Sequence, residues 1–168
     1  KNAGVIYDRA HSSFATLQPG SIDWEKVLEG VSWFHFSAIC PALNQAAAAI
    51  CLEAVKAASA RNIPISIDLN YRAKLWQYGK QPVDVMPELV RYATLVMGNI
   101  WAAEKMLGIA LPLGSDTLQD KTLCLEQAQK TSEEIIKNYP NCSTVANTFR
   151  FDKGEGICYY TAVYTQNK

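Results

Sequence analysis

Residues 31–70 decide the fold and read VSWFHFSAICPALNQAAAAICLEAVKAASARNIPISIDLN. They begin with a near-continuous apolar run of strand length, VSWFHFS, which is typical of a strand covered on both faces. Pro41 ends the run, and an alanine-rich helix follows over residues 43–61, whose small side chains let it lie close to a sheet. Residues 64–69 then alternate with a period of two, as a second strand does. Strand, helix and strand in this order predict two parallel strands joined by a crossover helix.

Further helices and strands alternate on both sides of this stretch. Helices are expected from Pro82, over residues 100–107 with Gly108 as the stop, and over residues 122–138. Strands are expected at residues 5–7, 14–17, 94–97, 143–149 and 157–164, with a turn at residues 154–156. A short helix capped by Ser21 or Asp23 is expected to run to about Glu29. The sequence therefore predicts an α/β fold with a mainly parallel sheet and helices on both faces.

Composition excludes several classes of protein. The 168 residues carry 16 Lys+Arg and 16 Asp+Glu, and this neutral balance argues against a nucleic-acid surface. The longest apolar run, residues 46–52, is far too short to span a membrane. The five cysteines form no C-x-x-C pair, which favours free thiols in a reducing cytoplasm over a disulfide scaffold or a zinc site. We expect one cytoplasmic α/β domain that acts on small molecules.

Polar side chains follow the predicted strands at three places, where ligands bind in such sheets. Tyr7 and Arg9 share one face of the first strand, and this pair suits a small polyol or a sugar acid. The alternative is an arginine that lies in solvent at a strand end.

Asp68, Asn70 and Arg72 alternate past the end of a buried strand, where they can order a loop and neutralise an anion. The alternative is an Asp/Asn turn with Arg72 in solvent. Asn99 begins the helix that carries Glu104, and a helix N-terminus beside a carboxylate favours an anion with a hydrated cation. A plain helix cap with a surface glutamate is the alternative there.

The absence of several sequence motifs limits the reactions that this chain could catalyse. The chain contains no G-x-x-x-x-G-K-[ST], no G-x-G-x-x-G and no G-x-S-x-G, so the P-loop, the dinucleotide fingerprint and the hydrolase elbow are excluded. His35 lies inside an apolar strand and is expected to be a hydrogen-bonded core residue.

Four stretches together resemble the ribokinase-like (PfkB) carbohydrate kinases, and most of all their 2-keto-3-deoxygluconate kinase branch. They are Tyr7-x-Arg9 with Ser12-Ser13, the run FHFS at residues 34–37, Asp68-x-Asn70-x-Arg72-x-x-Leu75-Trp76, and Gly98-Asn99 with Glu104. The third is the most specific, and the order and spacing of the four span nearly the whole chain. The resemblance implies a ribokinase-like three-layer sandwich, incomplete at both ends.

The resemblance also implies a reaction, the ATP-dependent phosphorylation of 2-keto-3-deoxygluconate to its 6-phosphate. Tyr7 and Arg9 would hold the hydroxyls and carboxylate of the sugar acid. Arg72 would lie between the substrate and the transferred phosphate, with Asp68 and Asn70 ordering its loop.

ATP and Mg²⁺ are the cofactors that the resemblance implies. Asn99 and Glu104 would organise the Mg²⁺-bound phosphates, and Thr148 would lie near the nucleotide. The chain departs from the family pattern at Ala102, where the N-x-x-E motif has its glutamate, and at Phe149-Arg150, where a glycine-rich turn is usual.

Residues 1–168 are expected to form the central part of a single kinase domain, without the N-terminal lid strands and without the C-terminal Gly-Ala-Gly-Asp run. The general-base aspartate would then lie beyond Lys168, so this chain alone is expected to be inactive. Any homo-oligomer would form through the lid region. The alternatives are a fructokinase or another ribokinase-like sugar kinase, and a truncated, non-catalytic module that binds a sugar acid.

Overall fold

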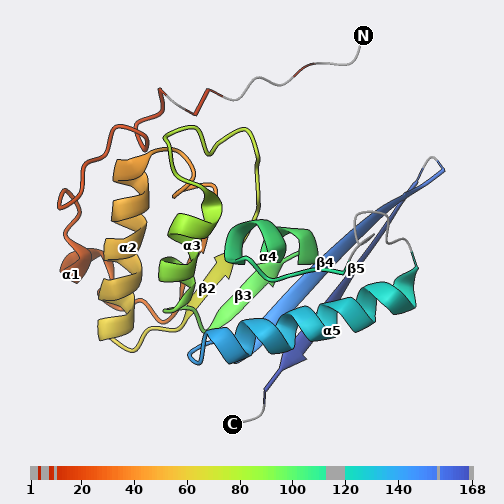
Figure 1. Cartoon of the computed structure of the whole chain (residues 1–168). Coiled ribbons are helices and arrows are strands. Elements are labelled where there is room, and N and C mark those ends of the chain that lie inside the picture. Colours follow the sequence, from red (N-terminus) through yellow and green to blue (C-terminus); the bar gives the residue numbers. More distant parts are fainter. Residues whose placement is uncertain (1–3, 5–7, 10, 113–119, 155, 167–168) are drawn as a thin grey trace.

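Five strands form one sheet in the computed structural model, which describes residues 4, 8–9, 11–112, 120–154 and 156–166. In spatial order the strands are β1 (Phe34–Ser37), β2 (Ile65–Asp68), β3 (Leu95–Gly98), β4 (Thr144–Lys153) and β5 (Gly156–Thr165). Strands β1 to β4 are parallel, and β5 pairs with β4 in the antiparallel sense (Figure 1). The predicted α/β fold with a mainly parallel sheet is confirmed.

Five helices connect or flank the strands. They are α1 (Trp24–Val27), α2 (Gln45–Ala60), α3 (Pro82–Val90), α4 (Ile100–Leu107) and α5 (Lys121–Asn138). Four of them begin at an Asp or Asn whose side-chain oxygen accepts a backbone N–H one turn on, namely Asp23, Asn44, Asn99 and Asp120. None of the helices in the described ranges has both the length and the apolar character that a membrane span requires.

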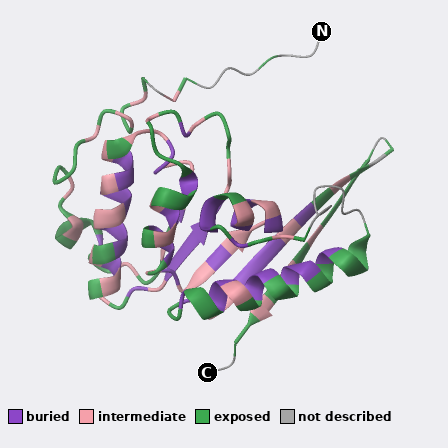
Figure 2. Cartoon of the chain, in the orientation of Figure 1, coloured by how far each residue is buried: buried purple, intermediate pink, exposed green. Residues whose placement is uncertain are grey.

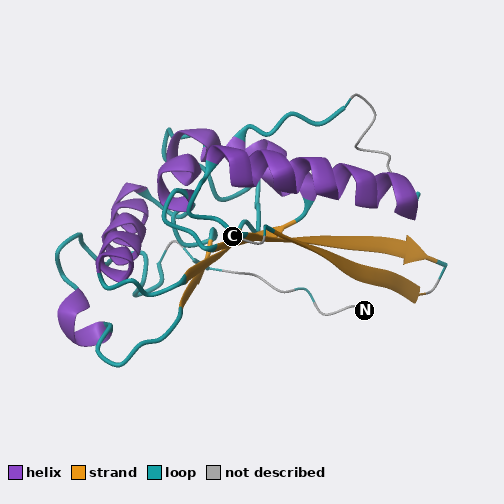
Figure 3. Cartoon of the chain, turned by 90° about the horizontal axis from the view of Figure 1, so that it is seen from below, coloured by secondary structure: helices purple, strands orange, loops and turns teal. Residues whose placement is uncertain are grey.

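Helices α2 to α5 all lie over one face of the sheet (Figure 3). Their buried sides face the strands, and their exposed sides face outward (Figure 2). Alternate strand residues on this face, among them Ile67, Val96 and Val145, are at most 2% exposed and share one core with α2 and α3. Burial of this apolar face against helices is the main force that holds the layers together.

Apolar side chains lie uncovered on the opposite face of the sheet. Trp33, Ile157, Tyr159 and Val163 are 50–63% exposed. The second helical layer that the sequence predicts is therefore not found among the described residues. Strand β1 is accordingly covered on one face only, although its apolar run predicts cover on both.

Three expectations for individual residues need correction or stay open. Residues 14–17 form no strand: residues 14–16 lie in turns, in which the Ala15 N–H donates to the Ser12 carbonyl oxygen, and residue 17 is irregular. His35 is exposed instead of buried in the core, but it is hydrogen-bonded, with Nδ1 at 2.7 Å from Ser66 Oγ. The strand expected at residues 5–7 lies outside the described residues.

A close approach joins the ends of β2 and β3. The Leu69 N–H donates to the Met97 carbonyl oxygen at 2.8 Å, and this bond brings Leu69 against Gly98. A Cβ atom built on Gly98 would lie 3.0 Å from the Leu69 Cβ, and the φ angle of Gly98 is +155°. Glycine is therefore required at this position both by space and by backbone conformation.

Gly98→Ala should destabilise the protein by about 1–3 kcal/mol, because the added methyl group overlaps Leu69. Urea unfolding followed by circular dichroism measures this change. Gly4→Ala is the control, since nothing lies within 4 Å of a Cβ at Gly4, and it should change stability by less than about 0.5 kcal/mol. Equal stability of the two variants would contradict the close approach.

Candidate active site

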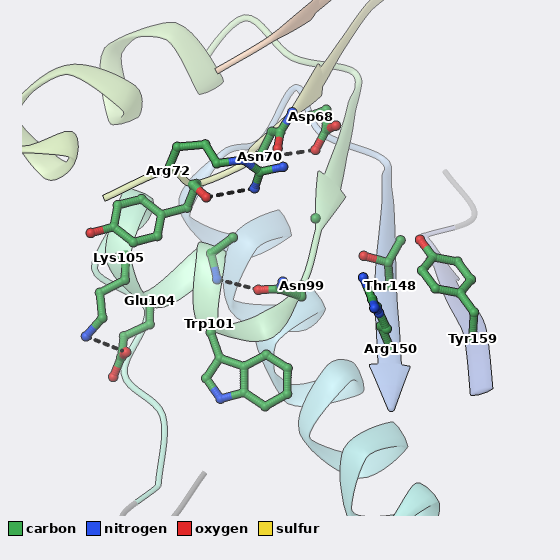
Figure 4. A pocket seen from close by; sticks show the side chains of 13 residues that line it. Asp68, Asn70, Arg72, Asn99, Trp101, Glu104, Lys105, Thr148, Arg150 and Tyr159 are labelled. Atoms are coloured by element: carbon green, nitrogen blue, oxygen red, sulfur yellow. Dashed lines mark hydrogen bonds and ion pairs between the residues drawn. The ribbon is translucent and has the colours of Figure 1, made fainter. Parts of the chain in front are cut away.

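A cavity of about 720 Å³ opens where the carboxyl ends of β2 and β3 meet the start of α4 and the middle of β4 (Figure 4). Ligands bind at this edge in open parallel sheets. The residues that line it are Asp68, Asn70, Tyr71, Arg72, Gly98, Asn99, Trp101, Ala102, Glu104, Lys105, Thr148, Arg150 and Tyr159.

The loop after β2 is ordered by two side chains of the predicted site. The Asn70 N–H donates to Asp68 Oδ1 at 3.0 Å, and the Asn70 amide group donates to Ser37 Oγ at 3.0 Å. The φ angle of Asn70 is +24°, a conformation that asparagine tolerates better than most residues. These bonds tie the end of β2 to the end of β1 and turn the chain toward the cavity.

Arg72 is exposed and lies on the cavity wall (Figure 4). Its Nη1 donates to the carbonyl oxygen of Tyr71 at 3.0 Å. Both interpretations of Arg72 from the sequence stay open, because the side chain reaches solvent and also lines the cavity. A guanidinium in this position can bind an anion that enters from solvent.

Helix α4 places two predicted residues on the cavity wall. Asn99 is the N-cap, and its Oδ1 accepts the Ala102 N–H at 2.7 Å. This bond uses the amide oxygen, so the NH₂ group of Asn99 can still donate to a ligand. Glu104 forms an ion pair with Lys105 at 3.0 Å.

Strands β4 and β5 form the remaining wall of the cavity (Figure 4). Thr148 is half-buried, and Arg150 follows it on the same face of β4. Tyr159 is the direct partner of Arg150 in the antiparallel register. Arg150 also forms an ion pair with Asp152, with Nη2 at 3.3 Å from Oδ1.

The cavity brings together six of the eight site residues that the sequence predicts: Asp68, Asn70, Arg72, Asn99, Glu104 and Thr148. Arg9 is half-buried and does not line the cavity, and its carbonyl oxygen accepts the Ser12 hydroxyl at 2.7 Å. Tyr7 lies outside the described residues.

Sequence reasoning missed Trp101, Lys105, Arg150 and Tyr159 as cavity residues. A signal for Arg150 exists, since it stands two residues after Thr148 and must share its face of the strand. Tyr159 follows only from the strand register.

The donor set of the cavity limits how a metal ion could bind. No group of three or more His, Cys, Asp or Glu side chains able to hold a metal occurs in the described part of the chain. The cavity carboxylates are those of Asp68 and Glu104. Mg²⁺ commonly binds through one or two carboxylates together with substrate phosphates and water, so these residues fit an ion that arrives with a phosphate ligand.

A pair of thiols lies beside the loop that follows β1. The Cys40 N–H donates to the carbonyl oxygen of Ser37, whose hydroxyl holds Asn70. A side-chain hydrogen bond with Cys51 lowers the pKa of Cys40 to about 7, and the same bond raises the pKa of Cys51. None of the five cysteines, all of which belong to the described residues, forms a disulfide.

Comparison with known proteins identifies the relatives of this fold. No family model matches the chain. The crystal structure of 2-dehydro-3-deoxygluconokinase from Thermotoga maritima superposes with a TM-score of 0.78 and 33% identity, covering 96% of this chain and 46% of that one. A PfkB family carbohydrate kinase from Listeria grayi gives a TM-score of 0.75 at 23% identity, over 98% of this chain and 47% of that one. The structural neighbours of this chain are PfkB-family carbohydrate kinases.

The fold is therefore ribokinase-like, as the four sequence stretches indicate. A curated relative, 2-dehydro-3-deoxygalactonokinase from Haloferax volcanii, is 35% identical over 72 residues, which are 43% of this chain and 22% of that protein. The chain spans less than half the length of each of these three relatives.

Asn99→Ala should lower the free energy of unfolding by about 1 kcal/mol, because the first turn of α4 loses its cap. Asn99→Asp should stay within about 0.5 kcal/mol of the wild type, because aspartate keeps the acceptor oxygen and suits a helix N-terminus. Urea unfolding measures both, with the exposed Asn138→Ala as control. If the aspartate variant were as unstable as the alanine variant, capping by Oδ1 would be disproved.

Alkylation of Cys40 by iodoacetamide should increase with pH through a midpoint near 7, since the thiolate is the reactive form. Cys51→Ala removes the hydrogen bond that lowers the pKa, so the midpoint should move up toward that of an ordinary thiol, about 8.5. Mass spectrometry of the Cys40 peptide measures both profiles. An unchanged midpoint in Cys51→Ala would show that another group sets the pKa of Cys40.

Proposed function

We propose that this chain is the central part of a PfkB-type kinase that transfers a phosphoryl group from ATP to a sugar acid, converting 2-keto-3-deoxygluconate to its 6-phosphate. The observation that carries the proposal is the cavity, which gathers Asp68, Asn70, Arg72 and Asn99 at the carboxyl ends of β2 and β3. The 33% identity to the Thermotoga maritima enzyme, whose name states this substrate class, supports the choice of sugar acid.

The cavity has the parts that phosphoryl transfer needs. This reaction depends mainly on positioning and on neutralising the charge of the transferred group. Arg72 supplies a positive charge that a phosphate can reach from solvent. The N-terminus of α4, with Asn99 as its cap, adds backbone N–H groups on the same wall.

Mg²⁺ bound to the nucleotide would supply further charge neutralisation. Asp68 and Glu104 are the cavity carboxylates that would orient it, directly or through water. To do so, Glu104 has to exchange Lys105 for the ion. The ion pair between these two residues is partly exposed to solvent and therefore weak. Thr148 would contact the nucleotide from β4.

Recognition of the sugar acid is assigned to Tyr7 and Arg9, because a guanidinium binds a carboxylate through two parallel hydrogen bonds. This assignment rests on the sequence resemblance. The general-base aspartate is proposed to belong to the part of the kinase that follows this chain, which spans 46% of the Thermotoga enzyme. The 168 residues alone are therefore proposed to bind ligands without turning them over.

In the kinase that contains this chain, Arg72→Ala should lower kcat/KM for 2-keto-3-deoxygluconate at least ~100-fold, because the transferred phosphate loses its counter-charge. Stability should change by less than about 0.5 kcal/mol, since the side chain is exposed and donates only to a neighbouring carbonyl. The kcat/KM of Arg72→Lys should lie between that of the wild type and that of Arg72→Ala, because lysine keeps the positive charge but cannot form two parallel hydrogen bonds to a phosphate. A coupled ADP-release assay measures the rates.

The matched control is Arg91→Ala, an exposed arginine that does not line the cavity. An unchanged kcat/KM in Arg72→Ala would remove Arg72 from the site. Turnover of fructose in preference to the sugar acid would overturn the proposed substrate class.

A further inference from the structure

Arg150 is a cavity residue that neither the sequence motifs nor the proposed reaction uses. It extends from β4 two residues after Thr148, on the same face of the strand, and its side chain is 62% exposed. Figure 4 shows Thr148, Arg150 and Tyr159 together on one side of the cavity. A long cationic side chain at this place needs an explanation, because Arg150 adds nothing to the core.

The charges around the cavity favour an anionic ligand. Three cationic side chains line its walls, namely Arg72, Arg150 and Lys105, and the last of these forms an ion pair with the cavity residue Glu104. The partner of Arg150 is Asp152, which does not line the cavity and is 78% exposed. An ion pair between exposed groups is worth little in water. A phosphate group can therefore replace Asp152 at the Arg150 guanidinium.

The spacing of the two arginines suits an extended anion. Arg72 follows β2, Arg150 belongs to β4, and β3 lies between them. Neighbouring strands are ~4.8 Å apart, so β2 and β4 run about 10 Å apart, and the two arginines extend from chain segments on opposite sides of β3. A single carboxylate binds one guanidinium through its two oxygens, whereas a chain of phosphates can bind the guanidinium groups of both Arg72 and Arg150.

We infer that Arg150 binds the phosphate chain of the nucleoside triphosphate, and that it makes binding depend on the number of phosphates. This inference rests on the proposed kinase function and deepens it, by naming a residue that distinguishes the donor nucleotide. Tyr159, the direct partner of Arg150 on β5, forms the outer wall beside it.

The test measures binding to the 168-residue chain by isothermal titration calorimetry, with ATP, inorganic tripolyphosphate, adenosine and 2-keto-3-deoxygluconate as probes. Arg150→Gln should weaken ATP and tripolyphosphate about 10-fold or more, since a charged hydrogen bond to phosphate is lost. Arg150→Lys should lie between this variant and the wild type, because it keeps the charge alone. Adenosine should bind equally to all three. Arg91→Gln, outside the cavity, is the matched control.

The outcomes separate the inference from the proposed function. If Arg150→Gln matches Arg91→Gln while Arg72→Gln weakens ATP, Arg150 has no such role and the proposed site stands. If Arg150→Gln weakens 2-keto-3-deoxygluconate instead of ATP, the residue binds the sugar acid and the inference is wrong. If the wild-type chain binds neither ATP nor tripolyphosphate, the inference is wrong as well. Sugar-acid turnover by the kinase that contains the chain is the separate test of the proposed function.

A second measurement keeps the inference testable if the chain or a variant fails to give a folded circular dichroism spectrum. In the kinase that contains this chain, Arg150→Gln should raise KM for ATP about 10-fold and leave KM for the sugar acid unchanged. A merely structural role would move both constants or neither.

Discussion

The contact between Leu69 and Gly98 is the constraint on which the candidate site depends. One backbone hydrogen bond, from the Leu69 N–H to the Met97 carbonyl oxygen, continues the β2–β3 pairing for one residue past the end of β2. The lack of a side chain at residue 98 lets the two chains stay close there. As a result the loop with Asn70 and Arg72 and the helix capped by Asn99 leave the sheet side by side. The polar groups of this loop and of this helix therefore converge on one cavity. The backbone pairing alone places the two segments, and no side-chain contact between them is needed.

The sequence predicts this part of the molecule well because local rules determine it. Asn99 and Gly108 mark the two ends of α4 through cap chemistry that involves only near neighbours. The short parallel strands follow from apolar runs bounded by proline or glycine. Asp68, Asn70 and Asn99 could be placed near one another because the carboxyl ends of parallel strands share an edge.

What could not be predicted depends on relations between distant residues. Tyr159 enters the cavity wall only because it is paired with Arg150, and a strand register is fixed by the whole hairpin. The exposure of His35 and Trp33 depends on what lies over the sheet, and a single strand does not carry that information. Residues 14–17 look like a strand by composition, but hydrogen bonds such as that from the Ala15 N–H to Ser12 fold residues 14–16 into turns.

The uncovered sheet face also affects how this polypeptide behaves in solution. Trp33 precedes β1 at one edge of the sheet, and Ile157, Tyr159 and Val163 belong to β5 at the other edge, so both edges leave large apolar side chains open to solvent. The fraction of charged residues, 19%, is low for a chain of this length, so few charges are available to offset these side chains. At the concentrations used for crystallisation or magnetic resonance, colloidal stability will depend on this face more than on the free energy of folding. Polar replacements at Trp33, Ile157 and Val163, which do not line the cavity, are the natural route to a well-behaved sample.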